Sequence, residues 1–169
     1  MRNYAIFALA VFLCIVSAFC EPPQREGPAI GYMSTPNSFV YRSPFSSESA
    51  MDFWLDLPEV LIGTDGAMRF GGGLGYAMFL MRQDDFAFMV RPQMSFGYVE
   101  ENYERGEIGI GATAAVTAYL DNLGMDDTDI YAGVSLGSVI EFGEDYTTLR
   151  LLLTRESPFG LVIGIMRYF

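Results

Sequence analysis

Apolar side chains recur at every second position along most of this chain after residue 28. The clearest run is Phe86 to Tyr98, in which large apolar residues alternate with small or polar ones. A period of two is that of a β-strand, because successive side chains point to opposite faces of a sheet. The alternation therefore predicts strands that have one apolar face and one face of small and polar groups.

Eight segments show this alternation and are separated by turn residues. They are residues 29–34, 50–57, 67–80, 86–98, 107–120, 129–142, 146–154 and 159–169. Most are longer than the roughly 5–6 residues that are usual in soluble domains. Their lengths match the roughly 9–11 tilted residues with which a β-strand crosses a bilayer.

The non-apolar face of these segments is composed mostly of Gly, Ala, Ser and Thr, and the charges gather in the connections at 84–85, 100–101, 126–127 and 144–145. A soluble sheet would carry charged side chains on its wet face. Small residues fit the packed interior of a narrow barrel instead. Because a membrane tolerates no open sheet edge, we expect an all-β fold for residues 29–169. It is a closed antiparallel up-and-down β-barrel of about eight strands, with its apolar face toward lipid.

Residues 1–20 read as a signal-peptide helix. Arg2 precedes an apolar stretch from Ala5 to Ala18, and Ala18-Phe19-Cys20 supplies a cleavage site. Two alternatives stay open, namely a retained N-terminal anchor helix and lipidation of Cys20. Residues 21–28 contain three prolines and are expected to form a flexible, solvated leader. Both cysteines lie within residues 1–20, so the mature chain is expected to have no disulfide.

Composition argues against several classes of function. The formal net charge is −11, there is no His, and every basic residue is Arg. Binding to nucleic acid is not expected, because it requires an excess of cationic side chains. The absence of His and Lys removes the usual general base and Schiff-base chemistry. We therefore expect no enzymatic activity, no catalytic residue, no cofactor and no metal.

Two motifs have forms that are found in ligand sites. Gly109 to Ala114 has the spacing of a dinucleotide fingerprint, but it lies in an alternating strand and not before a helix. The acidic residues at 126–129 lack the Gly and distal Glu of a calcium loop. We interpret the first as part of a strand and the second as a solvated turn.

The C-terminal run from Leu161 to Phe169 alternates and ends in Phe. Together with the signal peptide and the earlier strands, it makes residues 29–169 resemble the small eight-stranded outer-membrane barrels of Gram-negative bacteria. The resemblance implies an outer-membrane location, with the lipid bilayer and the barrel-assembly machinery as partners. It also implies that Phe169 is the assembly signal. Arg167 departs from the family, in which a hydrophobic residue is usual at that place.

Strand parity places a set of charged residues on the barrel interior: Asp52, Asp56, Arg69, Arg91, Glu107, Glu141 and Arg150. A buried charge without a partner costs several kcal/mol, so each interior Arg is expected to lie near one of these carboxylates. The set has two interpretations. It fills the lumen as paired structural charges, or it forms a polar relay or narrow ion path.

The leading functional hypothesis is a non-enzymatic outer-membrane barrel with a structural, surface-exposed or adhesive role. The longest connection, from about 35 to 47, contains Phe39, Tyr41 and Phe45, which are the candidate loop contacts for a partner. One alternative is a soluble periplasmic or secreted barrel that binds an apolar ligand, as lipocalin-like proteins do. Another is a membrane enzyme, which the absence of His disfavours.

Overall fold

The structure is a computed structural model that describes residues 25, 27–34, 37–61, 67–83, 85–100, 104–143, 147–152 and 160–169. These residues form ten strands and one short 3₁₀ helix: β1 (Ala29–Met33), β2 (Ser38–Ser46), β3 (Ser49–Asp56), β4 (Glu59–Leu61), β5 (Ala67–Arg82), β6 (Phe86–Glu100), β7 (Glu104–Tyr119), η1 (Asp121–Leu123), β8 (Thr128–Gly143), β9 (Thr147–Leu152) and β10 (Gly160–Tyr168). The predicted signal peptide lies outside the described residues. Within them, no helix is both long and apolar enough to cross a bilayer.

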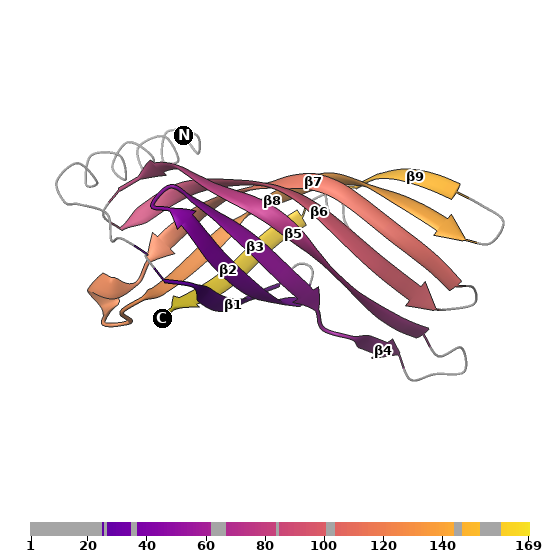
Figure 1. Cartoon of the computed structure of the whole chain (residues 1–169), viewed down its shortest axis with the longest axis horizontal. Helices are drawn as coiled ribbons and strands as arrows, with labels where there is room; N and C mark the ends of the chain where they lie inside the picture. Colours follow the sequence, from indigo (N-terminus) through magenta and orange to yellow (C-terminus); the bar gives the residue numbers. More distant parts are fainter. Residues whose placement is uncertain are drawn as a thin grey trace, which may run out of the picture.

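The strands close into a barrel (Figure 1). The order β10-β1-β2-β3-β5-β6-β7-β8 returns to β10, because β10 pairs with both β1 and β8. β4 pairs with the start of β5, and β9 pairs with the last part of β8. These two strands extend the wall without adding a place to the ring. The prediction of an all-β closed antiparallel barrel with eight strands is confirmed.

One of the eight places is filled by a strand that the sequence pattern does not predict. The predicted connection from 35 to 47 is wrong, because Ser38–Ser46 forms β2 between β1 and β3. Conversely, two predicted segments, at 146–154 and 159–169, share a single place beside β8 as β9 and β10. The sequence of β2 is not predicted to be a strand because it contains several serines and Pro44, which are typical of turns. In the barrel, Pro44 lies at a register shift near the end of the strand, where proline is tolerated.

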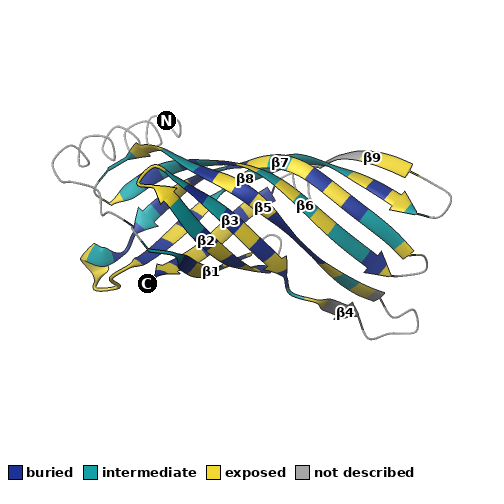
Figure 2. Cartoon of the chain, in the orientation of Figure 1, coloured by how far each residue is buried: buried dark blue, intermediate teal, exposed yellow. Residues whose placement is uncertain are grey.

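Burial alternates along the strands, so that one face of the wall is buried and the other is exposed (Figure 2). On β6, Ala87, Met89 and Arg91 are buried, whereas Met94 and Phe96 on the opposite parity are exposed. The same division holds around the ring, where many large apolar side chains point outward. They include Ile30, Phe39, Phe53, Phe70, Leu74, Phe96, Ile110, Val134, Leu136, Leu161 and Ile163. The largest fully buried side chains include Arg42, Arg91, Tyr131, Met33, Met89 and Met166.

Glycine makes room for the bulky side chains inside the barrel. A Cβ atom added to Gly73 would overlap the Trp54 ring, and one added to Gly164 would overlap the Tyr131 ring. Glycine within a strand often marks such a close approach. The glycines on the inward face therefore let large side chains lie flat against the wall.

Both ends of the described chain meet at one end of the barrel, which we call the terminal end. Ala29 pairs there with Tyr168, and the connections β2–β3, β5–β6 and β7–β8 turn at the same end (Figure 1). We call the opposite end the far end. β5, β6, β7 and β8 have 15 or 16 residues, whereas β1, β2, β3 and β10 have five to nine.

Candidate functional site

Three charged residues occupy the middle of the barrel, and we call them the central cluster: Arg42, Asp52 and Arg91. Each is at most 1 % exposed. Arg42 grips the Asp52 carboxylate with two hydrogen bonds, Nε to Oδ1 at 2.7 Å and Nη2 to Oδ2 at 2.8 Å. Arg91 Nη1 donates to the same Oδ2 at 3.1 Å. Paired hydrogen bonds between charged groups are among the strongest in proteins, and here they hold β2, β3 and β6 together.

Because one carboxylate serves two arginines, the central cluster needs further partners. Arg42 Nη1 donates to the Tyr168 hydroxyl at 3.2 Å, and Arg91 Nε donates to Gln93 Oε1 at 3.2 Å. The Arg91 guanidinium also lies 5.5 Å from the centre of the Trp54 ring. Aromatic faces attract cations, most strongly where water is excluded. These contacts offset part of the cost of burying two cations with one anion.

A polar group continues from the central cluster across β6, β7 and β8. Gln93, which accepts from Arg91, also accepts a hydrogen bond from Thr113 Oγ1 at 3.0 Å. Its amide donates to Ser135 Oγ at 3.3 Å, and Thr113 Oγ1 lies 3.2 Å from that same oxygen. The lumen at this level is therefore filled by side chains that satisfy one another.

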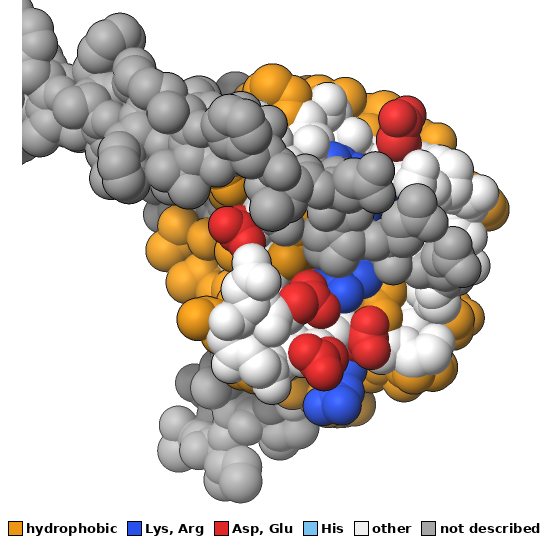
Figure 3. All heavy atoms as spheres, turned by 90° about the vertical axis from the view of Figure 1, so that its left-hand side faces the viewer, with side chains coloured by type: hydrophobic (Ala, Val, Ile, Leu, Met, Phe, Trp, Pro, Cys, Tyr) orange, Lys and Arg blue, Asp and Glu red, His pale blue; other side chains and the backbone are white. Residues whose placement is uncertain are grey.

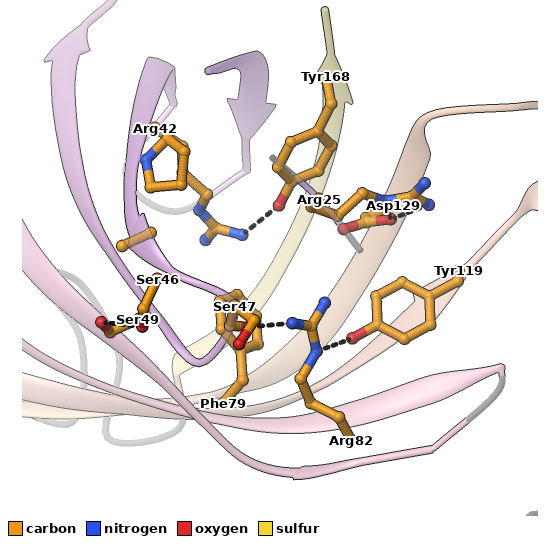
Figure 4. Close-up of a pocket in the computed structure, with 12 residues that line it drawn as sticks. Arg25, Arg42, Ser46, Ser47, Ser49, Phe79, Arg82, Tyr119, Asp129 and Tyr168 are labelled. Atoms are coloured by element: carbon orange, nitrogen blue, oxygen red, sulfur yellow. Dashed lines mark hydrogen bonds and ion pairs between the residues drawn. The ribbon is translucent and has the colours of Figure 1, made fainter. Parts of the chain in front are cut away.

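A second charged group, the terminal cluster, consists of Arg25, Asp121 and Asp129. Arg25 Nη1 and Nη2 donate to the two oxygens of Asp121 at 3.0 and 2.5 Å. Its Nε and Nη2 donate to Asp129 Oδ1 at 3.1 and 2.8 Å. The rings of Tyr119 and Tyr168 lie 5.5 and 5.4 Å from the guanidinium carbon (Figure 4).

The β7–β8 connection is folded so that the acidic groups of the terminal cluster converge. Gly124 and Asp127 have φ angles of 75° and 58°, in the left-handed region that glycine adopts freely and aspartate tolerates. The Asp127 N–H donates to Asp121 Oδ1 at 3.1 Å. This hydrogen bond holds the Asp121 carboxylate beside the residues that lead into β8.

The contacts of Arg25 change the proton affinities of its partner and of itself. The hydrogen bonds from Arg25 are the largest influence on Asp121, and they lower the pKa of this carboxyl below its ordinary value of 3.8. Burial by itself lowers the pKa of Arg25, but the hydrogen bonds to Asp121 and Asp129 outweigh it, so the pKa is raised. Both groups are therefore held in their charged forms at neutral pH.

A third charged group, the far cluster, lies toward the far end. Arg69 Nη2 is 3.5 Å from Glu107 Oε2, and Arg105 Nε is 3.7 Å from Glu107 Oε1. Glu141 stands directly opposite Glu107 in the β7–β8 ladder, and both glutamates are buried. The two arginines therefore lie beside a pair of neighbouring carboxylates.

The structure brings several of the predicted interior residues together. Asp52 bonds to Arg91, Arg69 lies beside Glu107, and Glu141 pairs across the ladder with Glu107. Asp56 accepts a hydrogen bond from Ser38 at 2.7 Å, and Ser38 belongs to none of the three clusters. Arg150 pairs with Val139 through its backbone, and its side chain lies outside the described residues.

Reasoning from the sequence missed two of the buried arginines, Arg42 of the central cluster and Arg25 of the terminal cluster. Arg42 lies in the segment wrongly predicted to be a connection, although its alternation with Phe39 and Tyr41 is the signal that could have found it. Arg25 lies in the segment predicted to be a solvated leader, yet it is buried. No local pattern marks Arg25, because its partners are about one hundred residues away in the chain.

A small cavity lies between the terminal and central clusters. It has a volume of about 10 Å³, which is about the space that one water molecule needs. Its lining includes Arg25, Arg42, Arg82 and Tyr168, and Figure 4 shows how these side chains crowd it. Within the part of the chain that the structure describes, no group of three or more acidic residues could hold a metal ion.

No protein-family model, no curated protein and no solved structure matches this chain. Its architecture therefore stands on the strand pairing itself, and the chain is a β-barrel protein. In the interior clusters, arginines and carboxylates lie within ion-pairing distance of one another. These contacts join strands that are distant in the sequence.

Proposed function

We propose that this chain is a non-enzymatic outer-membrane β-barrel protein with a structural or surface-exposed role. The observation that carries the proposal is the outer face of the barrel, which presents many large apolar side chains, while charged residues lie inside beside buried apolar ones. Arg42, Asp52 and Arg91 lie inside, at most 1 % exposed, whereas Phe96 and Ile110 on the outer face are 59 and 63 % exposed. Soluble proteins rarely leave apolar patches of more than a few hundred square ångströms open to water.

A bilayer accounts for both sides of this wall. Membrane barrels present apolar side chains to lipid and polar ones to the lumen, and closure leaves no strand edge unpaired. The outward face of β6 is apolar from Phe86 to Tyr98. This length exceeds the roughly 9–11 tilted residues that cross a bilayer. Phe70 and Tyr98, whose rings are 5.3 Å apart, lie toward the end of this band, as aromatic residues do at membrane interfaces.

The candidate loop contacts acquire a different role in this proposal. Phe39, Tyr41 and Phe45 lie on β2 and are exposed by 57, 45 and 65 %. Phe39 and Tyr41 share the outward face with their neighbours on β1 and β3. We therefore assign them to contact with lipid chains and not to a protein partner.

The alternative, a soluble lipocalin-like barrel, needs room for an apolar ligand. The middle of this barrel is instead filled by Arg42, Asp52, Arg91 and Tyr131, all fully buried. An apolar ligand placed there would separate these buried charges from one another, and the free energy of such a separation is unfavourable. The packed lumen favours the membrane barrel as a closed structural unit.

The end of β10 fits assembly in an outer membrane. Phe169 is 69 % exposed and follows the outward-facing residues Leu161, Ile163 and Ile165. Its side chain is thus open to recognition by an assembly machinery. Arg167, two residues before Phe169, lies on the same outward face. It is at the terminal end, where its long side chain can reach the lipid headgroups.

Cell fractionation of the expressed full chain, followed by gel electrophoresis with and without boiling, tests this proposal. We expect the protein in the outer-membrane fraction, with a band whose mobility changes on boiling. Met94→Arg, near the middle of the outward apolar face of β6, is expected to lower the free energy of unfolding by about 2–4 kcal/mol, because it places a cation in lipid. The control is Glu104→Arg, at an exposed position at the far end of β7. Recovery of the chain in the soluble periplasm, with Met94→Arg as stable as the unsubstituted protein, would contradict the proposal.

A further inference from the structure

The terminal end of the barrel holds a cation in a chamber built from four side chains. Asp121 and Asp129 contact the Arg25 guanidinium along different edges, and the Tyr119 and Tyr168 rings lie 5.5 and 5.4 Å from its centre. Two carboxylates with two aromatic rings are groups that recognise a planar, delocalised cation. They are less well suited to an ammonium, whose point charge cannot bond along two edges.

The chamber contains an atom that is not satisfied by its present occupant. Asp129 is 1 % exposed, and its Oδ2 has no hydrogen-bond partner within the part of the chain that the structure describes. The neighbouring cavity of about 10 Å³ is lined by Asp129, Arg25 and Tyr168. This oxygen is a further acceptor for N–H donors in the chamber, beyond those that Arg25 uses.

We propose that Tyr119, Asp121, Asp129 and Tyr168 form a guanidinium-binding site, that Arg25 of the same chain occupies it as a latch over the terminal end, and that a free guanidinium binds there when Arg25 is removed. This site depends on the barrel being closed and not on whether lipid surrounds it.

The positions of the four residues in the sequence indicate at which stage of folding Arg25 can dock. Tyr119 ends β7, Asp121 lies in the connection, Asp129 lies in β8, and Tyr168 ends the last strand, β10. The chamber is complete only when β10 has joined β8 and β1. Arg25, from the other end of the described chain, therefore docks after closure and ties the segment that precedes β1 to the finished barrel.

Tyr168 connects the latch to the central cluster. Its ring faces Arg25, and its hydroxyl accepts a hydrogen bond from Arg42 Nη1 at 3.2 Å (Figure 4). Seen from the terminal end, acidic and basic side chains lie next to one another, with apolar side chains visible toward the edges (Figure 3). Loss of Arg25 is thus expected to destabilise the terminal end and, through Tyr168, to weaken the hydrogen bond that Arg42 donates.

Chemical rescue of Arg25→Ala tests the site. The probe is methylguanidinium at concentrations below those that denature, and the readout is the thermal unfolding midpoint of the purified, folded full chain. We expect Arg25→Ala to lower the midpoint and Arg167→Ala, at an exposed outward position, to leave it nearly unchanged. Methylguanidinium is expected to raise the midpoint of Arg25→Ala saturably by at least about 3 °C.

Three controls decide the interpretation. Methylammonium, with the same charge but no planar fork, is expected to give a smaller rise. The unsubstituted chain, whose site is occupied, and the double variant Arg25→Ala/Asp129→Asn are expected to give no saturable rise. An equal rise in the unsubstituted chain, or none in Arg25→Ala, would overturn the proposal. If Arg25→Ala does not fold unaided, its refolding yield is measured with the same probe, and failure of methylguanidinium to raise the yield counts against the site.

Discussion

Asp52 is the residue on which the middle of the barrel depends. It receives hydrogen bonds from Arg42 on β2 and Arg91 on β6, and all three are removed from solvent. Within the part of the chain that the structure describes, the other hydrogen-bond partners of the two arginines are not carboxylates. Removing the negative charge therefore leaves two buried cations, which is far more costly than breaking an ion pair at a surface.

Asp52→Asn is expected to lower the free energy of unfolding by about 3–5 kcal/mol. The matched control is Asp126→Asn, at an exposed position in the β7–β8 connection, which is expected to change stability little. Denaturant unfolding of the folded barrel measures both. Equal stabilities of the two variants would mean that the central cluster contributes nothing to the fold.

The terminal cluster gives stability a dependence on pH. The hydrogen bonds from Arg25 lower the pKa of Asp121 below 3.8 in the folded chain. A carboxyl whose folded pKa is depressed stabilises the fold fully above its unfolded pKa, and the contribution is lost as pH falls toward the folded value. The stability that Asp121 contributes is thus expected to be lost as pH falls below about 4, and this loss is expected to be smaller in Arg25→Ala.

An NMR titration of the Asp121 side chain measures this directly. In the unsubstituted chain the carboxyl is expected to titrate below 3.8, and in Arg25→Ala its midpoint should rise. An Asp121 midpoint that is the same in both proteins would show that Arg25 does not control this carboxyl.

At the scale of single residues, the sequence predicts the interior face but not the pairs on it. Alternation within each strand places Asp52 on β3, Arg91 on β6 and Glu107 on β7 on the inward face of the wall. The distances between them depend on the register between strands, which no single strand encodes. Arg25 is a clearer case, because it precedes the first strand and contacts side chains whose positions are fixed only by closure.

At the scale of elements, β2 shows where the pattern fails. Its inward residues Ser38, Val40 and Arg42 alternate with Phe39 and Tyr41, as in the other strands. The alternation is short and is followed by Pro44 and three serines, which favour a turn. Ladders with β1 on one side and β3 on the other override this local preference. The long strands β5 to β8 were predictable because their alternation continues well beyond any turn signal.

Proline substitution distinguishes a strand from a connection at this segment. Tyr41→Pro removes a backbone donor in the middle of a strand that is paired on both sides, so we expect the folded, heat-modifiable species to be lost. Ser47→Pro, in the turn between β2 and β3, is the control and is expected to fold. Folding of Tyr41→Pro with unchanged stability would contradict the assignment of β2.

At the scale of the whole molecule, alternate residues of each strand face the interior of the barrel and its outer surface. The ring closes through β10, many large apolar residues point outward, and the charged clusters lie within beside buried apolar residues. The sequence predicts closure because an open sheet of this polarity would have no place in either water or lipid. It does not predict that β9 and β10 share one place beside β8, since this depends on how far each strand extends along the wall.

The most direct test of the central claim is quenching of a fluorescent label at successive positions of β6. The expected mature chain has no cysteine, so single cysteines can be introduced and labelled at Met94, Ser95 and Phe96 in barrels reconstituted in vesicles. We expect lipids with brominated chains to quench the label at positions 94 and 96 strongly, and at position 95 weakly. Quenching of positions 94 and 96 by a water-soluble quencher, without quenching by the brominated lipids, would contradict the account.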